Sequence, residues 1–237
     1  MMVQPRNAST VVLLKPAGND AFEILLTRRP PQMRFLGGYY VFPGGAVHRD
    51  DYSSKVLERC RGLSANDARR ILGTDDNANQ ALGHWVAVVR ELFEEVGVLL
   101  CLTESGDELD LRDSGAKDRI ERKRQAIVKN ELDFGSFLES ENLICDLSRA
   151  VYFDHWVTPE IYSMRFDTRF YIAKLPSYQI PLGASEEVID SLWLSPQHAL
   201  LLIDRHDFPI LPPTTTVLAE LGRIRSWRGL QDRFHLV

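Results

Sequence analysis

The amino-acid sequence predicts an α/β fold in which strands and helices alternate along the chain. Short runs rich in β-branched and aromatic residues recur from the N-terminus to about residue 194. Between them lie stretches in which apolar residues recur every three or four positions, as on one face of a helix. The chain has no internal repeat and no flexible linker. The sequence therefore predicts one domain that spans residues 1–237.

Composition and charge exclude several classes of protein. The chain carries 28 Lys and Arg against 33 Asp and Glu, a net charge of -5, so no overall positive field favours nucleic acid or an anionic membrane. We expect neither as a partner. No apolar run approaches the roughly 18 residues of a spanning helix, and the N-terminus lacks a secretion signal, so we expect a cytoplasmic location. The three cysteines lack paired C-x-x-C spacing and are predicted to be buried, reduced thiols.

The first elements are predicted to be strands. Residues 9–15 and 22–28 are β-prone runs separated by turn-forming residues at 16–20, which favours an antiparallel pair. A third run at 39–42 stops at Pro43-Gly44-Gly45, because proline cannot donate to a ladder and glycine permits unusual backbone angles. Such a turn suits close approach of the backbone to a ligand or metal.

A long core helix is predicted near the middle of the chain. Five apolar residues fall within one helical arc, and Gly97 follows at the position of a C-cap: Trp85, Val89, Leu92, Phe93 and Val96. Before it, short charged pieces at about 46–80, including a stretch capped by Ser64, predict an inserted helical lobe. After it, residues 98–102 are predicted to form a buried strand.

The second half is predicted to continue the alternation. Charged residues at about 104–142 indicate a second peripheral helical segment, with an exposed helix at 117–129. Further elements follow as strands at 150–156, 169–174 and 188–194 and helices at 196–203 and 214–225.

Three carboxylates on the core helix stand out chemically. Glu91, Glu94 and Glu95 lie at positions i, i+3 and i+4, so they share one helical face. Hard divalent cations such as Mg²⁺ take oxygen ligands, and a rigid helix presents them with little reorganisation. The alternative is a solvated acidic stripe, since like charges at these spacings cost only about 0.2–0.5 kcal/mol per pair in water. Arg90 lies one turn before Glu94 and can brace a carboxylate.

These residues resemble a known family. The run R-E-L-F-E-E-V-G-V matches the second half of the Nudix box, G-x5-E-x7-R-E-U-x-E-E-x-G-U with U aliphatic, at every fixed position. F-P-G-G is the usual approach to the first glycine of the box, which we assign to Gly45. The resemblance implies a Nudix-type α/β/α sandwich with a mixed sheet, here with added helical insertions. It also implies Mg²⁺ or Mn²⁺ and hydrolysis of a nucleoside diphosphate linked to another group.

The box departs from the family pattern in its middle. Between Gly45 and Arg90 lie 44 residues where the box has 13, so about 31 are inserted. Eight positions before Arg90, where the first box glutamate belongs, the chain has Leu82. Three acidic residues of the insertion are candidates to replace that glutamate, and the sequence does not choose among them: Glu58, Asp75 and Asp76.

A second resemblance concerns the substrate. The segment L-L-T-R-R-P, with the later Arg34, Gly38 and F-P-G-G, is similar to the coenzyme A signature L-L-T-x-R-[SA]-x3-R-x3-G-x3-F-P-G-G of Nudix coenzyme A diphosphatases. Pro30 departs from it. The resemblance implies substrate contacts for Arg28, Arg29, Arg34, Gly38 and Gly44. Guanidinium forks suit bidentate phosphate binding, while the alternative is that these arginines are ordinary surface cations.

The branch of the family is indicated by further matches. The long insertion in the box, W-V-T-P at 156–159 and R-F-D-T-R-F at 165–170 resemble the acyl-coenzyme A diphosphatases. Residues 235–237 read H-L-V rather than the peroxisomal S-K-L address, which agrees with a cytoplasmic location. The insertion could close over a ligand or form a homodimer interface, and the sequence does not separate these uses.

The implied reaction is attack of water on the diphosphate of coenzyme A or acyl-coenzyme A, giving 3′,5′-ADP and (acyl-)4′-phosphopantetheine. Metal ligands would be Glu91, Glu94, Glu95 and the Gly45 carbonyl. Arg90 would orient a carboxylate, and Glu187, beside Glu186, is the candidate base on a later loop. Two alternatives remain: a Nudix enzyme acting on ADP-ribose or NADH, and a Nudix-fold binding protein without catalysis.

Overall fold

A central mixed sheet organises the molecule. The computed structural model describes residues 3–33, 36–205 and 208–236. Within these residues the main path of the sheet runs β10-β2-β1-β9-β8, with β3 added to β2 and β4 added to β1. The strands are β1 (Arg6–Ala17), β2 (Ala21–Arg28), β3 (Tyr40–Val41), β4 (Gly44–Ala46), β8 (Ala150–Val157), β9 (Phe166–Lys174) and β10 (Asp190–Leu194).

Strand β1 lies at the centre of this sheet. It runs antiparallel to β2, as the turn residues predicted, and parallel to β9. Because successive side chains of a strand point to opposite faces, Val11 and Leu13 pack into one hydrophobic cluster and Val12 and Leu14 into another. A run of consecutive apolar residues is what a strand with two buried faces requires. Both faces of the sheet must therefore be covered.

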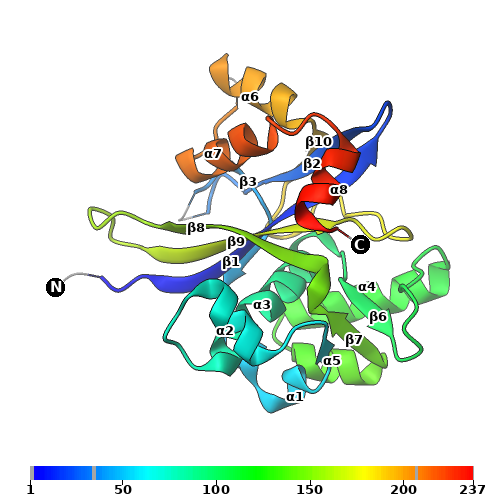
Figure 1. The fold of residues 1–237 in the computed structure, drawn as a ribbon. Helices are drawn as coiled ribbons and strands as arrows, with labels where there is room; N and C mark the ends of the chain where they lie inside the picture. Colours follow the sequence, from blue (N-terminus) through cyan, green and yellow to red (C-terminus); the bar gives the residue numbers. More distant parts are fainter. Residues whose placement is uncertain (1–2, 34–35, 206–207, 237) are drawn as a thin grey trace.

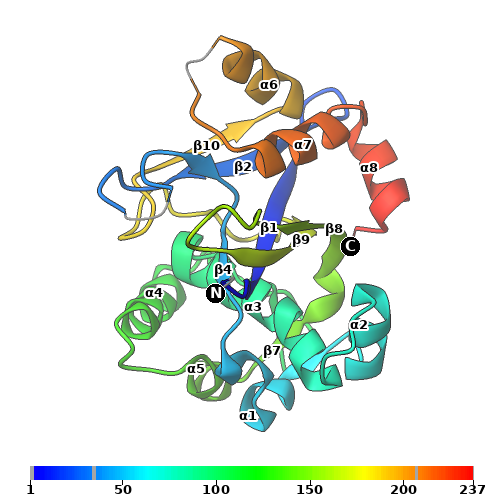
Figure 2. The same ribbon diagram turned by 90° about the vertical axis from the view of Figure 1, so that its left-hand side faces the viewer.

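One face is covered by the larger layer, which lies below the sheet in Figures 1 and 2. Its helices are η1 (Arg49–Tyr52), α1 (Ser54–Leu57), α2 (Ala65–Leu72), α3 (Ala78–Val96), α4 (Ser114–Val128), α5 (Phe134–Ser140) and η2 (Leu147–Arg149). A small second sheet in this layer has the order β5-β7-β6, with β5 (Cys60–Arg61), β7 (Leu143–Asp146) and β6 (Cys101–Thr103).

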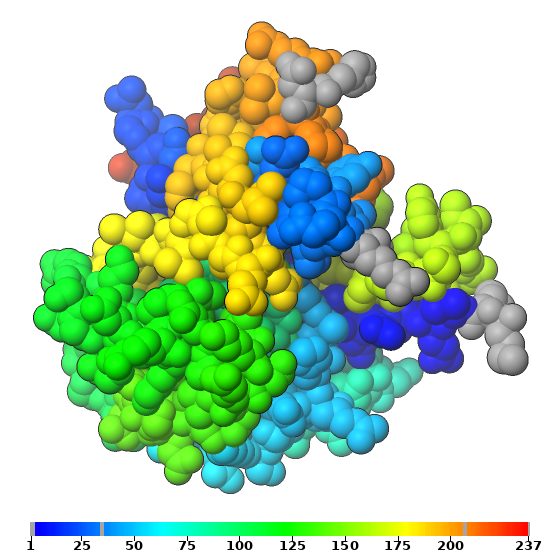
Figure 3. Space-filling view, turned by 180° about the vertical axis from the view of Figure 1, so that it is seen from behind, coloured from blue at the N-terminus to red at the C-terminus, as the bar shows by residue number. Residues whose placement is uncertain are grey.

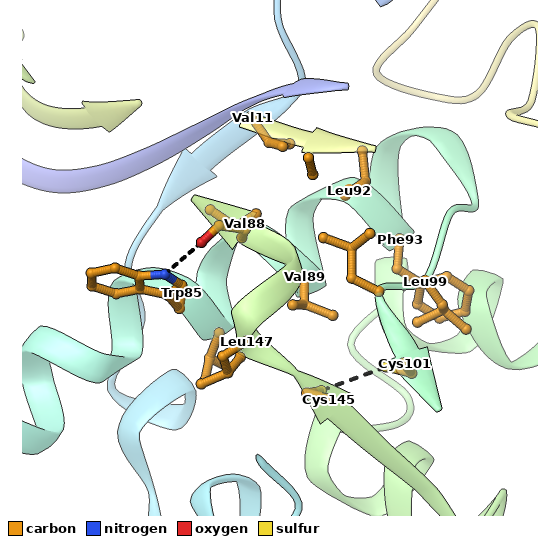
Figure 4. Close-up of a cluster of buried hydrophobic side chains, with 14 of the residues drawn as sticks. Val11, Trp85, Val88, Val89, Leu92, Phe93, Leu99, Cys101, Cys145 and Leu147 are labelled. Atoms are coloured by element: carbon orange, nitrogen blue, oxygen red, sulfur yellow. Dashed lines mark hydrogen bonds between the residues drawn. The ribbon is translucent and has the colours of Figure 1, made fainter. Parts of the chain in front are cut away.

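Helix α3 packs directly against the central sheet. It starts behind Asn77, whose side chain accepts a hydrogen bond from the Asn79 amide. It ends at Gly97, which adopts a left-handed conformation with φ 72° and closes the last turn. Figure 4 shows apolar side chains of α3, among them Val88, Val89 and Leu92, between the sheet above and the smaller sheet below. The predicted core helix is thus present and extends one to two turns further towards the N-terminus.

The opposite face carries the second layer, formed by α6 (Pro196–Asp204), α7 (Pro212–Leu221) and α8 (Trp227–Phe234). Val217, Leu218 and Leu221 of α7 and Leu230 of α8 are fully buried in the cluster that includes Val12 and Leu14 of β1. Figures 1 and 2 show these helices above the sheet. The architecture is therefore an α/β/α sandwich with a mixed sheet and added helices, as predicted. None of the described helices combines the length and hydropathy that a bilayer crossing requires.

The three cysteines converge although they are far apart in the sequence. Cys145 of β7 is in register with Cys60 of β5 on one side and Cys101 of β6 on the other. The sulfur atoms of Cys101 and Cys145 lie 3.6 Å apart, the contact drawn in Figure 4. All three are free thiols; Cys101 and Cys145 are buried and Cys60 is half-buried.

Several elements differ from the sequence prediction. Of the strand expected at 98–102, the structure has only β6, which begins at Cys101 and ends at Thr103. The backbone of the preceding Leu99 binds the Gln179 side chain instead of a neighbouring strand. The stretch at about 46–80 holds helical pieces, yet it also supplies β5, which pairs with β7. The segment at about 104–142 contains α4 and α5. Helix α8 was not predicted.

Candidate active site

The turn between β3 and β4 lies against the last two turns of α3. The Gly44 amide donates a hydrogen bond to Glu95 Oε2 at 3.3 Å. Gly45 packs on the carboxylate of Glu91, where a Cβ atom would lie only 2.4 Å from Oε1. Any side chain at Gly45 would displace that carboxylate. The two glycines therefore let the backbone meet two of the three predicted metal ligands.

Arg90 is the buried centre of the charged cluster. Its Nη1 lies 2.7 Å from Glu91 Oε1 and 3.4 Å from Glu94 Oε2. Its Nε and Nη2 bind both carboxylate oxygens of Asp51, at 2.7 and 3.0 Å, and Nη2 also donates to the Ala46 carbonyl. Burial disfavours the guanidinium charge, but Glu91 and Asp51 together hold the pKa of Arg90 above its ordinary value. Arg90 is thus a positioning residue for Glu91 and Glu94.

Asp51 is the acidic residue that sequence reasoning missed. It is 1% exposed and lies on η1. Counting forward from Gly45 through five residues, as the box does, reaches Asp51; counting back from Arg90 reaches Leu82, which is buried in the apolar core. The inserted residues therefore follow Asp51 instead of preceding the acidic position.

The three acidic residues proposed to replace the box glutamate do not take part in this cluster. Glu58 and Asp75 are exposed, and Asp76 is half-buried. Among the described residues, the carboxylates that hold Arg90 are those of Asp51, Glu91 and Glu94. The forward count from the glycine was the signal that could have identified Asp51.

Burial raises the pKa of each carboxylate of the trio. For Glu94 it reaches about 7, with Arg90 opposing the shift. The pKa of Glu91 is raised mainly by burial, and that of Glu95 by burial and then by the charge of Glu91. Glu187 adds to the shift of both Glu91 and Glu95. The cluster thus has more negative charge than Arg90 neutralises, a condition that favours a bound cation.

The carboxylates open into a cavity of about 360 Å³ between α3, α4 and the segment at 182–187. Figure 3 shows the green α4 region and the yellow segment around residue 180 side by side on this face. The lining residues are Glu91, Glu94, Glu95, Glu121, Arg124, Gln125, Val128, Lys129, Leu182, Ala184, Ser185, Glu186 and Glu187. Both later-loop glutamates therefore share the cavity with the trio.

The two described arginines of the coenzyme A signature have different surroundings. Arg28 donates from Nε to the Gly38 carbonyl at 3.2 Å, and its guanidinium lies 5.5 Å from the centre of the Tyr40 ring. Arg29 is close enough to Glu95 for its charge to oppose the raised pKa of that group. Its buried Nε has no hydrogen-bond partner among the described residues. Arg34, the third predicted arginine, lies outside the described residues.

The donor set has the chemistry that a divalent cation requires. The three carboxylates are hard oxygen donors, they share one cavity, and burial is the main cause of their raised pKa values. In the described ranges, no three acidic, His or Cys side chains already surround one common point. Arg90 and Gly45 hold Glu91 in place, so Glu94, whose side chain is 22% exposed, has the most freedom to turn towards an ion.

Comparison with known proteins agrees with this geometry. The model of the family described as the NUDT19 Nudix domain matches residues 5–224. The acyl-coenzyme A diphosphatase NUDT19 of Xenopus laevis is 26% identical over 226 residues, covering 84% of this chain and 60% of that protein. The human protein of the same name is 27% identical over 255 residues, covering 92% and 64%. The chain thus spans less than two thirds of the length of these relatives.

A solved structure supports the fold. The crystal structure of a Nudix hydrolase from Alicyclobacillus acidocaldarius superposes with a TM-score of 0.79 and 27% sequence identity, and the match covers 96% of both chains. The family match, the completed box with Asp51 and the sandwich agree with one another. This chain belongs to the Nudix hydrolase family, in the group described by the NUDT19 Nudix domain.

Proposed function

We propose that this chain hydrolyses the diphosphate of coenzyme A or acyl-coenzyme A in a reaction that depends on Mg²⁺ or Mn²⁺. The products are 3′,5′-ADP and (acyl-)4′-phosphopantetheine. The observation that carries the proposal is the buried cluster in which Arg90 joins Asp51, Glu91 and Glu94, because Glu91 and Glu94 also line the cavity. Burying this much charge is costly unless ligand binding uses it.

Glu91, Glu94 and Glu95 would hold the cation, with the Gly45 carbonyl as a further oxygen donor. A bound Mg²⁺ or Mn²⁺ would neutralise the diphosphate and lower the pKa of the attacking water. Arg90 fixes two of these carboxylates through contacts at 2.7 and 3.4 Å, and Asp51 fixes Arg90. Asp51 and Arg90 therefore act on the reaction by positioning.

Glu187 is the base that removes a proton from the attacking water. It lies in the cavity with the trio, and its charge contributes to the raised pKa of Glu91 and Glu95. Its own side chain is exposed, so solvent reaches it. Glu186 lines the same cavity and is the residue against which the role of Glu187 must be compared.

Arg29 is the substrate contact that the geometry supports best. An arginine held near Glu95, with a buried Nε that lacks a protein partner among the described residues, is suited to a phosphate oxygen. Arg28 is tied to Gly38 and Tyr40 and so supports the loop that carries the signature. The names of two relatives, both acyl-coenzyme A diphosphatases, support coenzyme A compounds as the substrate over other nucleotides.

The test is product detection with purified protein, Mg²⁺ or Mn²⁺, and a panel of coenzyme A, acetyl- and longer acyl-coenzyme A, ADP-ribose and NADH. We expect release of 3′,5′-ADP from the coenzyme A compounds. Hydrolysis of ADP-ribose or NADH alone would agree with the proposed metal site and contradict the assignment of coenzyme A as the substrate. A well-folded protein that is silent across the panel would contradict catalysis on these substrates.

A matched pair of variants assigns the activity to the cluster. Glu94→Gln preserves the size of the side chain and removes a metal-binding charge. We expect turnover to fall at least about 100-fold, because losing a metal ligand costs more than losing a residue that only positions a ligand. Glu131→Gln, an exposed glutamate outside the cavity, should turn over like the wild type. Wild-type activity in Glu94→Gln would contradict the metal site.

A further inference from the structure

Two different regions of the chain lie on either side of the carboxylates: the arginine signature and helix α4. Arg29 of the arginine signature, directly after the end of β2, lies close enough to Glu95 for their charges to interact. Helix α4 forms a wall on another side. In Figure 3 the yellow segment that leads to Glu186 and Glu187 separates the green α4 region from the blue signature region. A substrate whose diphosphate rests on the carboxylates therefore extends one part towards each region.

The wall on the α4 side combines a closed ion pair, between Glu121 and Arg124, with apolar and amide side chains. Val128 of α4 contributes to it together with Leu182 and Ala184 of the loop, and Gln125 lies one turn before Val128. Lys129, directly after the last residue of α4, is exposed and forms no ion pair among the described residues. Among the described residues that line the cavity, the cations are Lys129 and Arg124.

Arg124 is committed to protein contacts. Its side chain is buried, and Nη1 donates to the Glu94 carbonyl at 2.5 Å. Nε and Nη2 bind both carboxylate oxygens of Glu121, at 2.8 and 2.7 Å. These contacts attach α4 to the last turn of α3 and leave Arg124 with little capacity for a phosphate. The α4 wall therefore resembles a surface for an uncharged chain more than a second phosphate site.

We propose that α4 and the 182–184 segment bind the uncharged arm of the substrate, an apolar chain with amide groups, while the arginine signature binds the nucleotide part. This rests on the proposed function, in which the substrate is coenzyme A or its acyl derivative. Val128 and Leu182 contact the aliphatic carbons of the arm, and Gln125 hydrogen-bonds an amide. The second helical segment is therefore a specificity element of the active site.

The two halves of the cleaved substrate provide the test. Titration calorimetry in the presence of Mg²⁺ measures the affinity of 4′-phosphopantetheine and, separately, of 3′,5′-ADP. In Val128→Asn and in Gln125→Ala, which change no charge, we expect the Kd for 4′-phosphopantetheine to rise at least about fivefold. The Kd for 3′,5′-ADP should stay within about twofold, and Arg29→Ala should give the reverse pattern.

Controls separate this inference from folding and from the proposed function. Arg122→Ala, on α4 but outside the cavity lining, should leave both affinities unchanged. Lys129→Ala tests the alternative that the α4 side binds the nucleotide part through Lys129. A selective loss of 3′,5′-ADP affinity in this variant would overturn the proposal. Equal losses of both ligands in Val128→Asn, or no loss, would also overturn it. Hydrolysis of coenzyme A by the wild type tests the proposed function, and the affinities of the variants test the role of α4. Failure of one proposal can therefore be distinguished from failure of the other.

Discussion

The two faces of the central sheet are built from different residues. On the α3 face, buried charged or titratable side chains accompany the apolar core: Asp51, His84, Arg90, Glu91 and Glu95. On the face covered by α6, α7 and α8, the buried cluster is apolar, and Thr214 is the buried polar residue of α7. Both faces remove large apolar side chains from water. Among the described residues, only the first face also removes charge from water.

This difference indicates a division of roles. Apolar burial stabilises a fold without directional requirements, whereas each buried charge needs partners held in place. Apolar packing on the α6–α8 face therefore stabilises the sheet. This stability offsets the cost of burying charged side chains on the α3 face. Variants on the two faces should separate loss of stability from loss of function.

Removing Asp51 should have the largest effect. Asp51→Ala leaves the buried Arg90 without its bidentate partner, so we expect the free energy of unfolding to fall by about 3–5 kcal/mol. Urea denaturation measures this. Glu58→Gln and Asp75→Asn are the controls, since exposed acidic residues away from the cluster should change it by less than about 0.5 kcal/mol. A larger effect at Glu58 or Asp75 than at Asp51 would contradict the assignment of the box position.

A cavity on the opposite face should lower stability without altering the site. Leu218 is fully buried in the α6–α8 cluster, so Leu218→Ala should cost about 3 kcal/mol. Turnover per folded molecule, measured well below the midpoint of thermal unfolding, should stay at the wild-type value. A matching loss of turnover would mean that the two faces are not separate in function.

His84 should make stability depend on pH. It is 1% exposed, lies with Nδ1 3.0 Å from Ser9 Oγ, and has its pKa lowered to about 4 by burial and by Arg169. Between the ordinary pKa of 6.5 and about 4, the unfolded chain binds a proton that the folded chain does not. The free energy of unfolding should therefore fall by on the order of 2 kcal/mol as the pH drops through this window.

The control for this pH effect is a comparison of two histidines. His84→Asn should flatten the pH dependence of urea unfolding between pH 6.5 and 4, while the same change at the exposed His198 should not. Identical pH profiles for the wild type and His84→Asn would show that other groups control stability in this range.

The smallest expected effect concerns the acyl chain. Ile180, two residues before Leu182 of the cavity wall, is 84% exposed. Its neighbour Gln179 is buried and fixes the segment by two hydrogen bonds to the Leu99 backbone, at 2.8 and 2.9 Å. Ile180→Ser should lower kcat/KM for long acyl-coenzyme A about threefold and leave free coenzyme A unchanged. Equal effects on both substrates would exclude an acyl contact at Ile180.

The box helix was predictable because its signals are local. Apolar spacing, a C-cap glycine and three carboxylates within five residues depend on no distant part of the chain. The antiparallel pair of β1 and β2 followed from similar short-range patterns, whereas the α/β/α layers were expected from the resemblance of the box to the Nudix family. The Gly44-Gly45 turn was predicted as a point of close approach, and it lies against Glu91 and Glu95.

What the sequence did not reveal depends on contacts between distant segments. Asp51 meets Arg90 across 39 residues, so a count made from the wrong end of the insertion missed it. Cys60, Cys101 and Cys145 share a register only because β5, β6 and β7 assemble from separate parts of the chain. Helix α4 was expected to be an exposed charged helix. Its Arg124 is instead buried against α3, which no local pattern indicates.

The segment inserted between Asp51 and Arg90 begins and ends beside the candidate site. Tyr52, where it starts, packs against Gly83, where it ends, since a Cβ atom at Gly83 would lie 2.9 Å from the Tyr52 ring. For a loop with adjoining ends, doubling the length adds only about 0.6 kcal/mol of closure entropy. Closure entropy therefore does not set the length of this segment. Its packing does, because Val56 and Ala68 lie in the α3-side core and β5 pairs with β7.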